Sequence, residues 1–414
     1  MSTVELRERL ADRAVAGPKQ VAITGTFLGI LAAWLALPPA TVRTSTVPIV
    51  LGAIAIALGG YAALRDERRV GYGAVAAGIV GIPLGLLVQH SSVSHLDAAF
   101  AWGTLLAATL RYATPLTFAA LGGMFSERSG VVNIGLEGMM LAGAFFGIWG
   151  ADKSGSWIGG VAIAMLAGGV FGLVHAIFAI HLRADQIVGG TAINFLSLGL
   201  TGYLFIQVYG SNGTPSLSTG HWLTGESIPD VTISSGNNFF AQVFGQLNLM
   251  IWISFAVLVL SYLLMFRTSI GLRIRACGEH PRAADTVGID VYKVRYVSVV
   301  VSGMLAAMGG AYLSVGFTHS FNENMTEGRG FIALAALIFG KWRPFGAFAA
   351  ALLFGFSTAL AYAIPPAYSD TASSVLRSSA LFQALPYILT LIAVAGVIGR
   401  SIPPAADGRP YKRQ

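Results

Sequence analysis

The sequence predicts an all-α polytopic membrane protein. Hydrophobic residues make up 55% of its 414 residues and charged residues only 11%, whereas a soluble domain carries about 25% charged residues. Apolar stretches of about 20 residues, the length that a membrane helix needs, recur along the whole chain. The chain also has 51 glycines, and glycine lets membrane helices approach one another closely.

Residues 1–98 are expected to form an N-terminal extension with three transmembrane spans. The spans are predicted at about 20–38, 47–64 and 71–88. The segment before the first span and the loop after the second are rich in Arg, which predicts a cytoplasmic position. The loop after the third span has no Lys or Arg and is expected outside.

The apolar stretch 99–124 contains a charge, because Arg111 lies near its middle. A charged side chain at the centre of a bilayer costs at least about 2.5 kcal/mol. The sequence therefore predicts an interfacial helix that ends near residue 110. A short membrane segment, with Pro115 near its start, is expected to follow it.

The rest of the chain contains seven apolar stretches long enough to cross a membrane. They run at about 131–149, 156–181, 185–209, 246–266, 296–316, 344–363 and 381–399. A further stretch at 331–340 is too short to span comfortably, so we expect a tilted or re-entrant helix there. In total the sequence predicts about 11–12 membrane segments, including broken or re-entrant helices.

The distribution of Lys and Arg predicts the orientation, because cytoplasmic loops are enriched in both. The polar loop 210–245 has few basic residues and is expected outside. The loop 267–295 has six basic residues against three acidic ones and is expected inside. Residues 401–414 read as a basic cytoplasmic tail. Counting the crossings with 331–340 as a span places both termini and the loop 267–295 in the cytoplasm. The net charge of +7 is explained by these loops and ends, so no nucleic-acid partner is expected.

Residues 278–289 are predicted to form a short polar helix on the basic loop. Pro281 suits the first helical turn, where its missing N–H costs nothing, and Gly288 suits the helix stop. A small rigid projection of this kind can be gripped by a soluble motor protein, and an ordinary connector is the alternative. The candidate contact residues are Gly278, Glu279, Pro281, Arg282, Ala283, Ala284, Asp285 and Gly288.

Polar residues at membrane depth mark a second candidate region, at 126–140. Asn133 and Glu137 are four residues apart, so they share a face if the segment is helical, and glycines interrupt the apolar pattern around them. One interpretation is a broken helix that lines the translocation route. The other is a packing lock in which Glu137 bonds a neighbouring backbone. We favour the lock for Glu137 itself and a place near the route for the segment.

The apolar stretch 185–209 carries two more candidates for the pathway. Asn194 and Gln207 could hydrogen-bond a polar solute, although interhelical hydrogen bonds explain them equally well. His175, alone on its span, is interpreted as a packed neutral histidine.

Several chemical classes are excluded by missing motifs. The sequence has no phosphate-binding loop of the form G-x-x-x-x-G-K-[ST], no HExxH motif and no nucleophile elbow. Its single cysteine, Cys277, rules out a cysteine metal cluster and an intramolecular disulfide. Few carboxylates lie within the spans, which argues against a proton-coupled carrier. We expect no enzyme activity and no metal, and energy must come from another chain.

Three segments resemble the permease subunits of bacterial ABC importers, in the group shared by branched-chain amino acid and simple-sugar systems. They are Phe125–Leu141, Gly271–Ile289 and Gly328–Pro344. The run Gly-Val-Val-Asn-Ile-Gly-Leu-Glu-Gly-Met-Met within the first is closest to the nucleoside and simple-sugar branch. The resemblance covers roughly residues 99–400, which we treat as the permease core, and the extension 1–98 departs from the family pattern.

The resemblance implies an ABC importer permease fold in the bacterial plasma membrane, with a nucleoside or simple sugar as the solute. Two permease subunits, more often different than identical, would form the pathway above two ATP-binding-cassette ATPases. An extracytoplasmic solute-binding protein would deliver the solute. The segment 278–289 would dock into an ATPase, and ATP would be used there, so this chain would need no cofactor of its own. A branched-chain amino acid permease and a stand-alone carrier or channel are the alternatives.

Overall fold

A computed structural model describes most of the chain. The described residues are 17–37, 44–65, 67–89, 100–210, 228–234, 238–367 and 401–412, with a few single positions between them. The predicted span 381–399 and most of the loop 211–227 lie outside the described residues. Two compact units are present and are treated one at a time.

The first unit contains three apolar helices that pack against one another. They are α2 (Pro18–Ala36), α3 (Thr46–Leu64) and α4 (Arg68–Gln89), within a few residues of the predicted spans. Glycines bring the backbones together: a Cβ added to Gly59 would lie 2.6 Å from the carbonyl oxygen of Gly71. Close backbone contact of this kind is how small residues hold membrane helices together.

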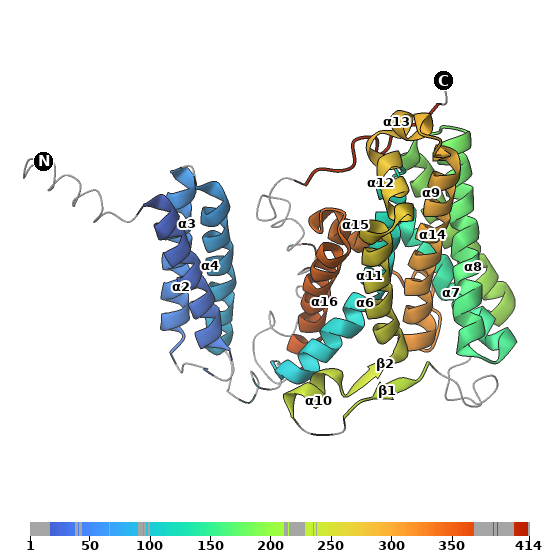
Figure 1. Ribbon diagram of the computed structural model, residues 1–414. Coiled ribbons are helices and arrows are strands. Elements are labelled where there is room, and N and C mark those ends of the chain that lie inside the picture. The colour runs from blue at the N-terminus through green and yellow to red at the C-terminus, as the bar shows by residue number, and fades with distance from the viewer. Residues whose placement is uncertain are drawn as a thin grey trace, which may run out of the picture. The chain divides into compact units, whose positions relative to one another are not determined.

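The second unit holds most of the remaining helices and one small sheet (Figure 1). Its first helices are α6 (Trp102–Arg128), α7 (Leu136–Ser154), α8 (Trp157–Ala176) with the π-helix η1 (Ile177–His181), and α9 (Gln186–Tyr209). Next along the chain are β1 (Asp230–Thr232), α10 (Phe239–Phe244), β2 (Gln246–Asn248) and α11 (Leu249–Arg267). The last are α12 (Ser269–Glu279), α13 (Pro281–Thr286), α14 (Val291–Ala311) with the π-helix η4 (Tyr312–Phe317), α15 (Arg329–Phe339) and α16 (Pro344–Ala367).

The core of this unit is built around α14, which packs against both α7 and α8. In the span formed by α14 and η4, 83% of an apolar stretch of 18 residues is buried. Protein therefore surrounds this stretch, which explains why it can be apolar on all sides. Its glycines touch neighbouring backbones directly: Gly303 approaches the carbonyl of Gly168, and Gly310 approaches that of Met140. Any larger residue at these positions would separate the three helices.

The structure corrects two predicted boundaries. The break expected near residue 110 is wrong, because α6 continues from Trp102 to Arg128 with Pro115 inside it. Arg111 is exposed, and its guanidinium donates to the carbonyl oxygen of Gln246 at 3.3 Å, so the charge has a polar partner. The helix expected from residue 131 begins only at Leu136, because residues 131–135 are irregular.

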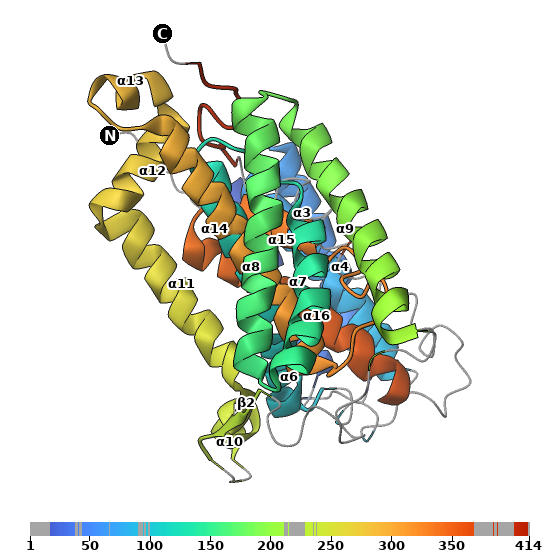
Figure 2. The same ribbon diagram turned by 90° about the vertical axis from the view of Figure 1, so that its right-hand side faces the viewer.

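The sequence analysis did not anticipate a short β-ribbon at the end of the loop predicted as polar and external. Strand β1 lies in this loop, whereas β2 occupies residues 246–248, so the span expected from residue 246 begins only at Leu249. Strands β1 and β2 pair antiparallel, with Asp230 opposite Asn248, and α10 lies between them in the chain. Figures 1 and 2 place this ribbon at one end of the second unit and α13 at the other.

Eight helical segments among the described residues are long and apolar enough to cross a membrane. The chain is therefore a multi-pass membrane protein with the predicted all-α character. Helix α15, at 11 residues, is about 16 Å long and cannot cross a bilayer core of about 30 Å. This confirms the expected short helix in that region, and it means that α15 by itself cannot be counted as a full membrane crossing.

Candidate functional site

The irregular segment between α6 and α7 lies inside the bundle, where its backbone needs hydrogen-bond partners. Side chains from two other helices supply them. Gln186 accepts from the backbone N–H of Val132 at 2.8 Å, and His175 bonds the carbonyl oxygen of Val132 through Nε2 at 2.9 Å. His175 is fully buried, which agrees with its interpretation as a packed histidine.

Asn194 and Asn133 continue this pattern. Asn194 donates to the carbonyl oxygen of Ile134 at 3.1 Å and accepts from the backbone N–H of Gly138 at 2.8 Å. Asn133 is fully buried and donates to the hydroxyl of Ser302 on α14 at 2.9 Å. Both amides therefore hold helices to the irregular segment.

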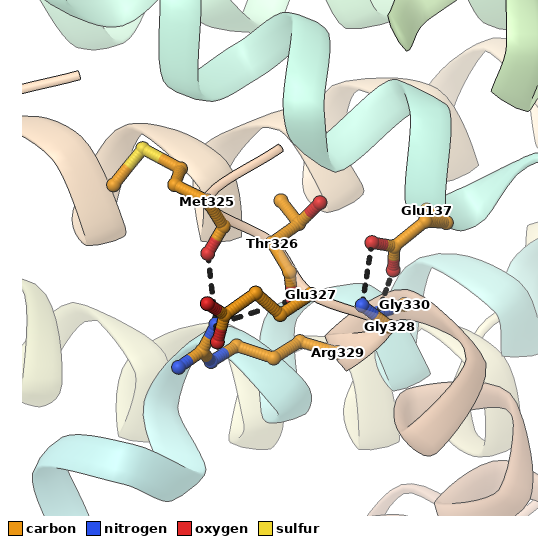
Figure 3. Close-up of polar contacts among 7 residues, drawn as sticks. All are labelled: Glu137, Met325, Thr326, Glu327, Gly328, Arg329 and Gly330. Carbon is orange, nitrogen blue, oxygen red and sulfur yellow. Dashed lines mark hydrogen bonds and ion pairs between the residues drawn. The ribbon is translucent and has the colours of Figure 1, made fainter. Parts of the chain in front are cut away.

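Glu137 joins α7 to the start of α15 (Figure 3). Its carboxylate accepts from the backbone N–H groups of Gly328 at 2.8 Å and Gly330 at 2.5 Å. A carboxylate is stabilised at a helix N-terminus by the free N–H groups and by the helix dipole. The expected bond from Glu137 to a neighbouring backbone is confirmed.

The turn before α15 is held by its own residues. Arg329 donates to the carbonyl oxygens of Met325 at 2.8 Å and Thr326 at 3.2 Å (Figure 3). Gly328 has φ +83, a conformation that favours glycine. Gln207, the fourth pathway candidate, is exposed on α9. A role of Asn133, Glu137, Asn194 and Gln207 in translocation stays a prediction.

The predicted polar helix is shorter than the expected range 278–289, because Gly278 and Glu279 belong to the end of α12. It is present as α13, which starts at Pro281 and is followed by Gly288 at φ +84. Its residues divide between two directions. Arg282 and Ala283 are exposed, as is the following Val287, of which 75% is exposed. Ala284 is buried, so it faces the chain's own core and is not free for a partner.

The C-terminal tail, residues 401–412, packs beside α12 and α13. The backbone N–H of Ala406 donates to the carbonyl oxygen of Gly278 at 2.8 Å, and that of Ala405 donates to the Glu279 carboxylate at 3.1 Å. Glu279 also lies 3.8 Å from the guanidinium of Arg128 on α6. The tail and the segment 278–289 thus form one surface, which the sequence analysis had treated as two.

Tyr411 closes this arrangement from the far end of the tail. It packs in an apolar cluster with Ala284, Cys277 and Val291. Burial raises the pKa of the Cys277 thiol to about 11, so the thiol stays protonated and unreactive at neutral pH. A cavity of about 660 Å³ lies between the tail and α13. Its lining includes Arg282, Ala283, Arg409 and Lys412.

Arg295 on α14 is the residue under this surface that sequence reasoning missed. Only 1% of it is exposed. It donates to the carbonyl oxygen of Ser129 at 3.0 Å and to that of Arg409 at 3.1 Å. Gly130 has φ +93, and an added Cβ there would lie 2.5 Å from the guanidinium. The signal in the sequence was a lone Arg at the start of a long apolar stretch.

The carboxyl group of Asp407, in the tail, lies within the electrostatic influence of Arg295. Burial raises the pKa of Asp407 to about 7, although the Gly408 backbone N–H and the Arg295 charge act to lower it.

The described residues contain no group of His, Cys, Asp and Glu side chains that could hold a metal ion. These contacts are suited to holding a docking surface in place.

Residues 105–394 match the family described as the branched-chain amino acid transport system / permease component. The chain belongs to this permease family. It is therefore a transport permease of the ABC importer type, as the sequence resemblance indicated. The chain matches no solved structure.

Three relatives illustrate where the chain lies within the family. It is 44% identical over 319 residues to the guanosine ABC transporter permease protein NupQ of Bacillus subtilis, across 74% of this chain and 96% of the relative. It is 39% identical to the nucleoside ABC transporter permease protein NupC of Lactococcus lactis, with the same coverage. A putative glucose ABC transporter permease protein of Haloferax volcanii, TsgC13, is 30% identical, across 73% of this chain and 94% of the relative.

The chain also matches a second permease from each of the first two organisms. It is 25% identical to the guanosine permease NupP of Bacillus subtilis, across 68% of this chain and 82% of the relative. It is 26% identical to the nucleoside permease NupB of Lactococcus lactis, across 59% of this chain and 69% of the relative. Its relatives are therefore ABC transporter permeases that occur in pairs within one organism.

Proposed function

We propose that this chain is one of two different permease subunits of a bacterial nucleoside importer driven by separate ATPase subunits. The observation that carries the solute class is the high identity to NupQ and NupC, whose names state guanosine and nucleoside transport. A simple sugar is the second candidate, favoured by the similarity to TsgC13. An extracytoplasmic binding protein would deliver the solute, as in the importers that the sequence resembles.

The presence of NupP beside NupQ, and of NupB beside NupC, supports a heterodimer. We place the second permease against the exposed apolar faces of this chain's spans, because membrane helices associate by close packing through small residues.

The proposed docking surface for the ATPase is made of α13, Val287 and the tail. Val287 presents an apolar side chain to solvent beside the exposed Arg282 and Ala283. An apolar centre within a polar rim is a common composition for a protein interface. The coupling residues of the sequence analysis belong to this proposal, except that Ala284 and Gly278 face inward. This assignment implies that α13 and the tail packed beside it lie in the cytoplasm. For the N-terminus, the same side is supported by the basic residues of the segment 1–19.

Uptake of labelled guanosine into cells tests the function. Cells would express this chain, its paired permease, the binding protein and the ATPase. We expect accumulation against a gradient that is abolished when the catalytic glutamate of the ATPase is replaced. Parallel assays with ribose, glucose and leucine identify the solute class. Accumulation without the ATPase would contradict the proposal and indicate a stand-alone carrier, and accumulation without the second permease would contradict the heterodimer.

A further inference from the structure

A second cavity lies at the end of the second unit that carries the β-ribbon, opposite α13 (Figures 1 and 2). Its volume is about 360 Å³, within the range of pockets that hold small molecules. The residues that line it include Arg111, Asp230, Asn248, Tyr312, Phe317 and His319. None of them belongs to the pathway candidates predicted from the sequence.

Tyr312 points to a ligand. Only 1% of it is exposed, and its hydroxyl has no hydrogen-bond partner within the described part of the chain. Burying a hydroxyl without a hydrogen-bond partner is unfavourable. An unpaired hydroxyl in the lining of a cavity is therefore expected where a bound ligand supplies the missing hydrogen bond. Tyr312 begins the π-helix η4, which ends at Phe317. Short π-helical turns are frequent at functional sites.

Asn248, another residue of the cavity lining, is held in place by the protein. The side chain of Asn248 donates to the carbonyl oxygens of Ile228 at 3.2 Å and Gly316 at 3.3 Å, and it accepts from the backbone N–H of Met250 at 3.0 Å. All of its hydrogen-bonding groups therefore serve the protein. This ties the β-ribbon to η4 and fixes the shape of the cavity.

Opposite charges and an aromatic ring complete the lining. Arg111 contacts the backbone of Gln246 with one guanidinium nitrogen, which leaves further donors. Asp230 is exposed and forms no ion pair with another described residue. The Phe317 ring lies 6.2 Å from that of Tyr312 and is partly exposed. His319 has φ +54, a strained conformation of the kind that concentrates at functional sites.

We propose that this cavity binds one molecule of the transported nucleoside at the mouth of the permease, before translocation. The Tyr312 hydroxyl and the Arg111 guanidinium donate to acceptor atoms of the base, Asp230 accepts from base N–H or ribose hydroxyl groups, and Phe317 packs on the ring. Donors and acceptors of both kinds suit a neutral heteroaromatic solute that carries hydroxyl groups. The identity of the solute rests on the proposed function, whereas the site itself rests on the cavity.

The test compares Tyr312→Phe with Tyr203→Phe, a matched change on the exposed surface of α9, in the assembled transporter. We expect the Tyr312 variant to raise the KM for guanosine uptake about tenfold, the effect of one lost hydrogen bond. Its ATPase activity without solute and its melting temperature should not fall, because no protein hydrogen bond is removed. Asp230→Asn is a second variant in which the same rise in KM is expected.

The stabilisation of the transporter by added guanosine gives an independent readout. It should be smaller in both cavity variants and unchanged in Tyr203→Phe. Unchanged KM and unchanged stabilisation in both cavity variants would overturn the site. The site would also be overturned if the cavity variants needed a higher concentration of the binding protein for uptake while guanosine stabilised them as much as the unmodified transporter. The cavity would then contact the binding protein and not the solute. If the unmodified transporter moves ribose but no nucleoside, the proposed function fails separately. The same variants assayed with ribose then decide the site.

Discussion

Arg295, near the start of α14, donates through Nη1 to the carbonyl oxygen of Arg409 in the C-terminal tail at 3.1 Å. One buried guanidinium thus fixes the tail, and through Ser129 it also fixes the end of α6. The tail in turn holds Gly278, three residues before the first residue of α13. The proposed docking surface is therefore connected to the core by side-chain and backbone hydrogen bonds.

Replacing Arg295 with Met should lower the free energy of unfolding by about 3 kcal/mol, because two backbone carbonyl oxygens, one of them buried, lose a charged donor. The thermal melting temperature of the purified permease measures this. Arg295→Lys should recover only part of the loss, since an ammonium group cannot reproduce the fork of a guanidinium. An equal melting temperature in Arg295→Met and the unmodified chain would show that the tail contact is dispensable.

Ala283→Trp should abolish copurification of the ATPase while leaving the fold intact, because Ala283 is exposed on the proposed docking surface. Ala284→Trp is expected to unfold the region instead, since Ala284 is buried against Cys277 and Tyr411 and overpacking costs about 1–3 kcal/mol or more. Copurification and melting temperature together separate the two effects. An ATPase that still binds the Ala283 variant would place docking elsewhere.

Glu137→Gln should destabilise the permease by about 1–3 kcal/mol, because a neutral amide accepts with one oxygen where the carboxylate uses two. Glu137→Asp keeps the charge but shortens the side chain, and it is expected to lose reach to Gly328 and Gly330 as well. Melting temperatures of the two variants test this. If guanosine uptake falls in Glu137→Gln without any loss of stability, Glu137 contributes to the route directly.

The melting temperature of the permease should fall as the pH is raised from about 4 to about 7, because Asp407 in the tail is partly buried. The folded pKa of Asp407 is raised to about 7, whereas an unfolded Asp titrates near about 3.9. In that window the folded protein binds more protons than the unfolded one, so stability decreases as pH rises and becomes level above the folded pKa. Asp407→Asn should weaken this dependence, and the buried Glu127 carboxyl, on which the charge of Asp407 acts, carries the rest of it. Glu67→Gln in the first unit should leave the dependence unchanged.

Introduced cysteines test the orientation. Val287→Cys should be labelled by an impermeant thiol reagent only after the membrane is opened, and Ser234→Cys should be labelled in intact cells. Cys277 contributes little background because it is buried and its thiol pKa is raised to about 11. The reverse pattern would invert the topology and remove α13 from the cytoplasm.

The sequence predicted the membrane helices well, because each depends on a local run of apolar residues. It also predicted α13, whose Pro281 and Gly288 act locally. It did not predict the irregular segment before Leu136 or the packed tail. The backbone groups of these segments form hydrogen bonds with side chains more than 40 residues away in the sequence, among them Gln186 and Arg295. Hydropathy and spacing carry no information about such pairings. The cavity beside Tyr312 was missed for the same reason, since its walls come from distant segments.

The bonds between Glu137 and the first N–H groups of α15 restrict the motions that transport can use. Pulling α15 away from α7 would leave a carboxylate surrounded by protein with no donor, an arrangement that costs several kcal/mol. A rearrangement that alternately opens the two ends of the route must therefore carry α7 and α15 as one rigid body. The moving boundary then lies at another face of α7, and cross-linking α7 to α15 should leave turnover intact.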